Sequence, residues 1–158
     1  ESLYLKEQGA ANADVTAYGQ LWVRQDTPNT LMFTDDAGND KNISANKIVK
    51  AITVESPTAS ENISMFFTTE AITVTQITAV IQGSTSVSFD IEHGASRATA
   101  TGTGVIGTDE VADSTTTGNI TTSFTDATIP ADSFVWLSTS ALSGTPTELN
   151  VTVEYTID

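Results

Sequence analysis

The residue types that carry most enzyme chemistry are rare in this chain. His93 is the only histidine among the 158 residues, and it lies at the end of an expected strand. A nucleophilic triad needs a histidine beside a serine and an aspartate, but the sequence contains no Gly-x-Ser-x-Gly elbow. A catalytic zinc site uses two or three histidines, so His93 could serve one only where three copies met on an axis. We interpret His93 as a turn residue and assign no catalytic residue.

One turn, residues 35–40 (DDAGND), gathers several acidic side chains. Calcium binds to several carboxylate and carbonyl oxygens, so Asp35, Asp36 and Asp40 are the candidate metal ligands. Their spacing does not match the EF-hand loop, in which ligands alternate before a glycine at the sixth position. Aspartate, asparagine and glycine are also the residues that tight turns select. The prediction is a hairpin turn, with no metal and no cofactor.

Aromatic rings that are exposed can stack on sugars, and Trp22, Trp136 and Tyr155 are the candidates. Trp136 lies in the stretch 134–137 (FVWL), which is typical of a core strand, so we expect it in the core.

A glycosidase needs two carboxylates across a cleft, and no local pattern singles out such a pair among the 20 acidic residues. The sequence therefore predicts no enzyme.

Composition excludes several other classes of protein. The formal net charge is −14, with 6 basic residues, whereas binding to nucleic acid or to an anionic membrane needs clustered Lys and Arg. The acidity suits solubility or a partner with a basic surface. There are no cysteines, which excludes disulfides and thiolate sites. No apolar run reaches the roughly 20 residues of a membrane span, so we predict no membrane insertion.

Strand signals dominate, because β-branched residues are abundant and alternation of apolar and polar residues is frequent. In the first part of the chain we expect an edge strand at 2–6 and a small meander of strands at 20–24, 30–34 and 41–44. The stretch 10–17 is either a helical turn or a loop. Near residues 45–50 the spacing of the strands changes, which divides the chain into residues 1–46 and residues 47–158.

The second part has strand candidates at regular spacing, separated by Gly, Ser, Thr or Pro. About eight strands without helices are typical of an antiparallel β-sandwich of the jelly-roll or Greek-key type. The candidates are 48–55, 63–69, 72–81, 86–92, 102–106, 120–124, 134–139 and 149–157. For residues 95–118 two interpretations stand, a Gly-rich strand with a long loop or a flexible protrusion, and we favour the first because Val105 and Ile106 can be buried.

A meander of this size cannot bury much apolar surface alone. We therefore expect its apolar side chains to be covered by the second part of the chain or by copies from neighbouring subunits. The predicted interface with other subunits consists of Leu3, Tyr4, Leu5, Leu21, Trp22, Leu31 and Phe33.

The stretch 19–40 (GQLWVRQDTPNTLMFTDDAGND), with 3–8 and 10–14 before it, resembles a short module of tailed-bacteriophage virion proteins. The similarity covers about the first 45 residues. The stretch 127–137 (ATIPADSFVWL) is similar in style to β-sandwich domains of phage structural proteins. The resemblance implies a virion component and no catalytic residues.

Three hypotheses about function follow. The first is a non-enzymatic, homotrimeric capsid-decoration protein, of the cement or head-fibre kind, that binds the major capsid protein or another virion protein and stabilises the exterior of the shell. The second is a tail-fibre-like protein that binds a receptor or a host-surface glycan. The third is a carbohydrate-active enzyme or a carbohydrate-binding module.

Overall fold

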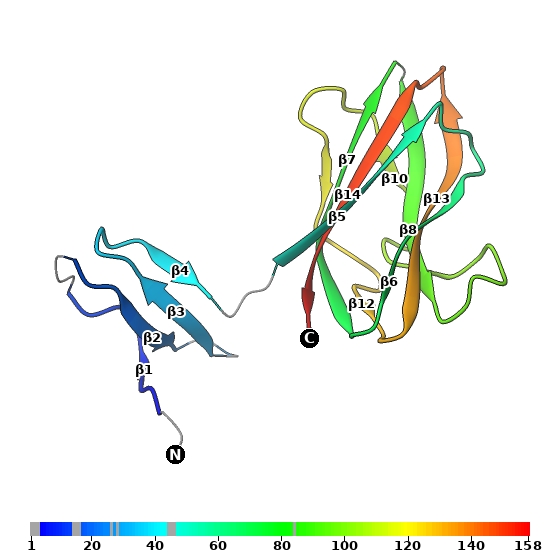
Figure 1. The fold of residues 1–158 in the computed structure, drawn as a ribbon. Helices are drawn as coiled ribbons and strands as arrows, with labels where there is room; N and C mark the ends of the chain where they lie inside the picture. The colour runs from blue at the N-terminus through cyan, green and yellow to red at the C-terminus, as the bar shows by residue number, and fades with distance from the viewer. Residues whose placement is uncertain (1–3, 14–16, 26, 28, 44–46, 84) are drawn as a thin grey trace. The chain divides into compact units, whose positions relative to one another are not determined.

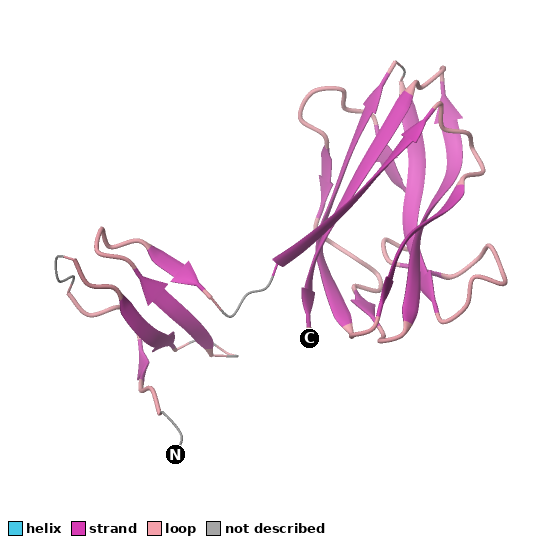
Figure 2. Cartoon of the chain, viewed as in Figure 1, coloured by secondary structure: helices cyan, strands magenta, loops and turns pink. Residues whose placement is uncertain are grey.

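The computed structural model describes residues 4–13, 17–25, 27, 29–43, 47–83 and 85–158. These residues form only strands and loops, which confirms the all-β prediction (Figure 2). The chain divides into two compact units, Glu1–Asn46 and Lys47–Asp158. Each unit has its own sheets, and each is described by itself below (Figure 1).

The first unit is one four-stranded sheet in the order β1-β2-β3-β4. Its strands are β1 Glu7–Gln8, β2 Gln20–Arg24, β3 Thr30–Thr34 and β4 Asp40–Asn42. Strands β2 to β4 form the expected antiparallel meander, whereas β1 pairs with β2 in parallel. The edge strand expected at 2–6 is wrong for Tyr4–Lys6, because pairing begins at Glu7 instead. The helical turn considered for 10–17 is absent from its described residues, and 14–16 lie outside them.

The second unit is a sandwich of two antiparallel sheets. One sheet has the order β11-β7-β14-β5 with β12 beside β7, and the other has the order β10-β8-β13-β6 with β9 beside β8. The strands are β5 Lys47–Glu55, β6 Asn62–Thr68, β7 Ile72–Gln82, β8 Ser86–Gly94, β9 Thr103–Gly104, β10 Glu110–Ala112, β11 Asn119–Thr121, β12 Thr128–Ile129, β13 Ser133–Ser143 and β14 Glu148–Ile157.

Strand pairing in the sandwich is nested. The outermost pair joins β5 to β14, the next joins β6 to β13, then β7 pairs with β11 and β12, and β8 pairs with β9 and β10. This nested order arises when a long antiparallel hairpin rolls up and its successive strand pairs alternate between two sheets. It is the strand order of a jelly roll.

The core lies between the two sheets, because alternate residues of each strand point inward. Along β14, Leu149, Val151, Val153 and Tyr155 are buried while the residues between them are half-buried. The facing sheet supplies the other half of the core from the inner positions of β8 and β13. These residues include Val87, Phe89, Ile91, Val135 and Leu137.

The segment 95–118 forms less regular structure than expected. Only Thr103–Gly104 of the strand expected at 102–106 pairs with β8, while Glu110–Ala112 forms a strand that the sequence did not indicate. Val105 and Ile106 are buried as expected, but they lie in an irregular turn beyond β9 and not in a strand. Glycines and small residues leave the segment free to follow the surface of the sheet instead of extending the ladder.

Strand β5 is an edge of its sheet, and Lys50 protects that edge. Ser56 N–H, just after β5, donates to the carbonyl of Thr147 beside β14. Hydrogen-bonded pairs alternate along an antiparallel ladder. The even-numbered residues of β5 therefore bond to β14, and the odd-numbered ones direct their N–H and C=O groups to the open edge. Lys50 pairs with the core residue Val153, so it lies on the inward-facing side of the sheet, yet it is exposed. An inward-facing charge at an edge opposes pairing with another strand, because that pairing would bury it.

Replacing Lys50 by valine should make the protein associate further. Lys50→Val removes the protecting charge and extends the apolar pattern of Ile48, Ile52 and Val54, so β5 can pair with a second β5. Light scattering after size exclusion should show a larger mass for Lys50→Val than for the parent at the same concentration. Lys50→Arg is the matched control and should keep the parent mass, and an unchanged mass for Lys50→Val would contradict this role.

Candidate functional site

One face of the first unit's sheet is closed within the unit. Trp22 and Met32 are cross-strand partners and are 3% and 2% exposed. The indole N–H of Trp22 donates to Thr34 Oγ1 at 2.8 Å, and the Thr34 hydroxyl donates to Asp40 Oδ1 at 2.6 Å. Trp22 therefore already has its cover and its hydrogen-bond partner. The expectation that Trp22 must be covered by other parts of the chain or by other copies is wrong.

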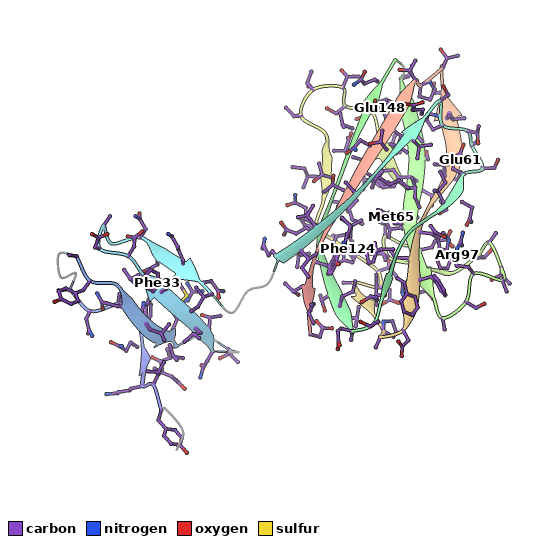
Figure 3. The ribbon with its side chains drawn as sticks, in the orientation of Figure 1. Phe33, Glu61, Met65, Arg97, Phe124 and Glu148 are labelled. Atoms are coloured by element: carbon purple, nitrogen blue, oxygen red, sulfur yellow. The ribbon has the colours of Figure 1, made fainter. Side chains whose placement is uncertain are left out.

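The opposite face of this sheet is apolar and open. Leu21 pairs with Phe33, and the two side chains are 49% and 36% exposed. Ile43, which follows β4, is 48% exposed, while Val23 and Leu31 are half-buried. Phe33 (labelled in Figure 3) lies against the backbone of Gly19, where a Cβ would come within 2.4 Å of its ring. We call Leu21, Val23, Leu31, Phe33 and Ile43 the open face.

The remaining predicted interface residues precede β1. Tyr4 is almost fully exposed and Leu5 is half-buried, whereas Leu3 lies outside the described residues. Of the seven residues expected at an interface, the structure thus places Leu21, Leu31 and Phe33 together on the open face, and it places Trp22 on the closed one.

The acidic turn is organised by its own backbone. Asp35 Oδ1 accepts hydrogen bonds from the N–H groups of Ala37 and Asn39 at 3.1 and 2.9 Å. The pKa of Asp35 is lowered most by the hydrogen bond from the Asn39 backbone, and also by those from the Asn39 side chain and the Ala37 backbone. The ammonium of Lys41, whose Nζ lies 3.6 Å from Asp35 Oδ2, lowers it further. Asp40 is held by Thr34, as described above. No three acidic or histidine side chains gather as a metal would require among the residues that the structure describes.

His93 and Tyr155 both occupy structural positions. His93 is buried, and its Nε2 lies 3.3 Å from Asp126 Oδ2 in the loop before β12. Tyr155 is buried and stacks on Phe66 with ring centroids 5.5 Å apart, and burial raises the pKa of its hydroxyl. Neither side chain is an exposed platform for a ligand.

Trp136 is buried by a loop, on the outer face of its sheet. It is 0% exposed, as expected, but its neighbours Val135 and Leu137 belong to the core cluster and Trp136 does not. The segment 95–102 after β8 covers it instead. The guanidinium carbon of Arg97 lies 4.2 Å from the Trp136 ring centroid, and a Cβ on Gly102 would lie 2.3 Å from the ring. The indole belongs to a small second cluster under this segment.

The Arg97–Trp136 stack contains two buried N–H donors without a partner. Arg97 Nε donates to Ser64 Oγ at 3.2 Å, and its Nη2 donates to the carbonyl and the side-chain oxygen of Asn62. Arg97 Nη1 and Trp136 Nε1, by contrast, are buried with no hydrogen-bond partner among the described residues. Leaving a buried donor unpaired costs about 1–3 kcal/mol, so this pair is the least satisfied polar spot that the structure describes.

A buried carboxylate organises the next part of the same segment. Asp90 accepts hydrogen bonds from the N–H groups of Ile91, Ile106 and Gly107 at 2.7, 3.0 and 3.2 Å. Gly104 packs so closely that a Cβ would lie 2.3 Å from Asp90 Oδ2. Burial raises the pKa of Asp90 above its usual value of 3.8, although the three N–H donors oppose the rise. Asp90 thus holds the turn at 104–107 against β8.

Comparisons with protein-family models, with curated proteins and with solved structures found no match for this chain. No pocket is detected in the part of the chain that the structure describes. No helix of that part has the length and apolar character to cross a membrane. Two features of the described residues stand out, the exposed apolar face of the first unit and the buried stack of Arg97 and Trp136.

Sequence reasoning did not find Arg97 or Asp90. Arg97 is one of only two arginines and the only one after residue 46, which is a signal that could have marked it in an acidic chain. Asp90 lies in the clean alternation of β8, between the core residues Phe89 and Ile91, so the pattern assigns it to the outer face. The pattern does not show that residues 104–107 fold back onto that face.

A methyl group at Gly102 should lift the segment 95–102. In Gly102→Ala the new Cβ would meet the Trp136 ring at 2.3 Å and the carbonyl of His93 at 2.6 Å, and such overpacking costs about 1–3 kcal/mol. In a Trp22→Phe background, Trp136 fluorescence should shift to longer wavelength and become more sensitive to acrylamide. Gly9→Ala, where nothing lies within 4 Å, should change neither, and unchanged quenching in Gly102→Ala would refute the close cover.

Proposed function

We propose that this chain is a non-enzymatic structural protein of a tailed-phage virion, a homotrimeric capsid-decoration protein on the exterior surface. The first unit attaches to the major capsid protein or another virion protein and joins the copies, and the sandwich projects. The observation that carries the proposal is the open face, on which Leu21, Phe33 and Ile43 are exposed. The resemblance of residues 19–40 to a virion module supports the same assignment.

The charges of the two units do not by themselves select the place where copies meet. Residues 1–46 hold seven acidic and three basic residues, which gives a net charge of −4, while residues 47–158 hold thirteen and three, which gives −10. Relative to their lengths the two units carry nearly equal negative charge, so repulsion opposes the association of either unit to a similar degree. The apolar side chains of the open face supply the attraction.

A tail-fibre-like protein that binds a receptor or a host-surface glycan is the second candidate. The observation in its favour is an aromatic pair outside the core cluster, Phe67 and Phe134, whose rings meet edge to face with centroids 4.8 Å apart. Phe67 is 47% exposed, and exposed aromatic faces stack on sugars.

The number of copies on a particle distinguishes the two candidates. Virions that contain this chain should carry hundreds of copies when measured by quantitative mass spectrometry, because decoration follows the many subunits of the shell. A reconstruction of the particle should place the density over capsid subunits. A few dozen copies or fewer, with density at the tail, would replace the first candidate by the second, and turnover of a polysaccharide would contradict both.

Replacing Leu21 by aspartate should dissociate the proposed trimer into monomers. Leu21 is half exposed in the single chain, so the change costs the isolated sheet little, but it places a charge where three copies meet. Because Leu21 is already half buried in the single chain, burying the rest contributes about 1 kcal/mol per copy to an interface. Light scattering should give the trimer mass for the parent and the monomer mass for Leu21→Asp. Ile120→Asp, an exposed apolar position of the sandwich, is the matched control and should remain a trimer.

A monomeric parent at micromolar concentration would contradict a trimer that forms in solution. The proposal would then require the capsid to organise the copies, which the same particle reconstruction would show as three-fold clusters of density. Equal effects of Leu21→Asp and Ile120→Asp would contradict the assignment of the interface to the open face.

A further inference from the structure

The segment 95–102 covers the largest side chain of the sandwich without contributing a large apolar residue. Its sequence is ASRATATG, and its residues other than Arg97 and Gly102 are exposed. Polar contacts hold it down: Asn62 Nδ2 donates to the carbonyl of Ala100 at 2.6 Å, and Gly102 N–H donates to Glu92 Oε2 at 2.6 Å. A cover with few buried apolar contacts opens at low cost in free energy.

Beneath this cover lie two donors that have no acceptor among the residues that the structure describes. Trp136 is 0% exposed, and its indole N–H and Arg97 Nη1 are the two unpaired donors. Because the Arg97 guanidinium stacks on the Trp136 ring at 4.2 Å, both donors belong to one compact group (Arg97 is labelled in Figure 3). A buried donor that is unpaired within the chain is satisfied either by a bound water or by an acceptor on a ligand.

The charge of Arg97 defines the kind of acceptor. Its hydrogen-bond partners, Ser64 and Asn62, are neutral oxygens, and among the described residues no carboxylate lies within ion-pair distance of it. The chain has 20 acidic side chains for 6 basic ones, so the lack of such a partner for Arg97 is unusual. A hydrogen bond between a guanidinium and a carboxylate is charge-assisted and roughly twice as strong as a neutral one, and Arg97 Nη1 has no partner among the described residues.

We infer that Arg97 and Trp136 form a binding site for a carboxylate group on an external ligand, which reaches it when residues 98–102 lift while Arg97 stays bonded to Asn62 and Ser64. The carboxylate accepts from Arg97 Nη1 and from the indole N–H of Trp136. Asn62 and Ser64 hold the guanidinium in place through the bonds described above. The site lies in the sandwich, so it does not depend on the proposed function of the chain as a virion protein.

The indole N–H resonances of the two tryptophans test the site directly. In the ¹H–¹⁵N spectrum of the full chain, Trp22→Phe identifies the Trp136 signal. Sodium glucuronate and N-acetylalanine present a carboxylate on a sugar ring and on a peptide end, and glucose and sodium chloride are the controls without one. The Trp136 signal should move downfield in a saturable way with one or both carboxylates, while the Trp22 signal, already bonded to Thr34, should stay.

The two carboxylates distinguish the source of the ligand, because the one that binds more tightly shows whether a sugar ring or a peptide end is preferred. Arg97→Gln should abolish the shift, and Arg24→Gln, at the other arginine, should leave it intact. An unmoved Trp136 signal with both carboxylates in the parent protein would overturn the inference, whether or not Arg97→Gln folds. An equal shift with glucose or sodium chloride would overturn it as well.

Discussion

Every strand has two faces, and the structure of this chain depends on what covers each of them. In the sandwich the inner faces of the two sheets cover one another, and the alternation along β14 shows how complete that cover is. On the outer face of the second sheet, a folded-back segment covers Trp136 and Asp90. In the first unit one face is closed around Trp22, and the other leaves Leu21, Phe33 and Ile43 exposed. The two features of interest, the open face and the Arg97–Trp136 stack, lie on the faces that no second sheet covers.

The sequence predicts the parts of this structure that depend on alternation. Strands β2 and β3 have the expected bounds, and the core positions of β8 and β14 follow from their period of two. It does not predict β1, because Glu7–Gln8 has no apolar pattern, and its pairing with β2 depends on contacts across the sheet. The prediction for Trp22 failed for a related reason, since Met32 and Thr34, which complete its cover, become its neighbours only through the register of β3.

The polar groups of the outer face could not be predicted from local patterns either. Asp90 obtains its three donors from residues up to 17 positions away, and Arg97 obtains its acceptors from residues more than 30 positions before it. Such contacts exist because small residues and glycines let the segment 95–107 approach the sheet closely. Arg97 is one of only six basic residues. Its guanidinium donates to the neutral oxygens of Ser64 and Asn62, which leave its charge without a counter-charge among the described contacts.

The nested pairing of the sandwich also sets an order of events during synthesis. Strands β13 and β14 lie at the centres of their sheets, and each pairs with strands on both sides. Neither sheet can close until residues 133–157 have emerged, whereas all the strands of the first unit lie within residues 7–42 and can pair much earlier. During that interval the apolar strands β5 to β8 lack the strands that complete their sheets, and unpaired strands of this kind are prone to aggregate.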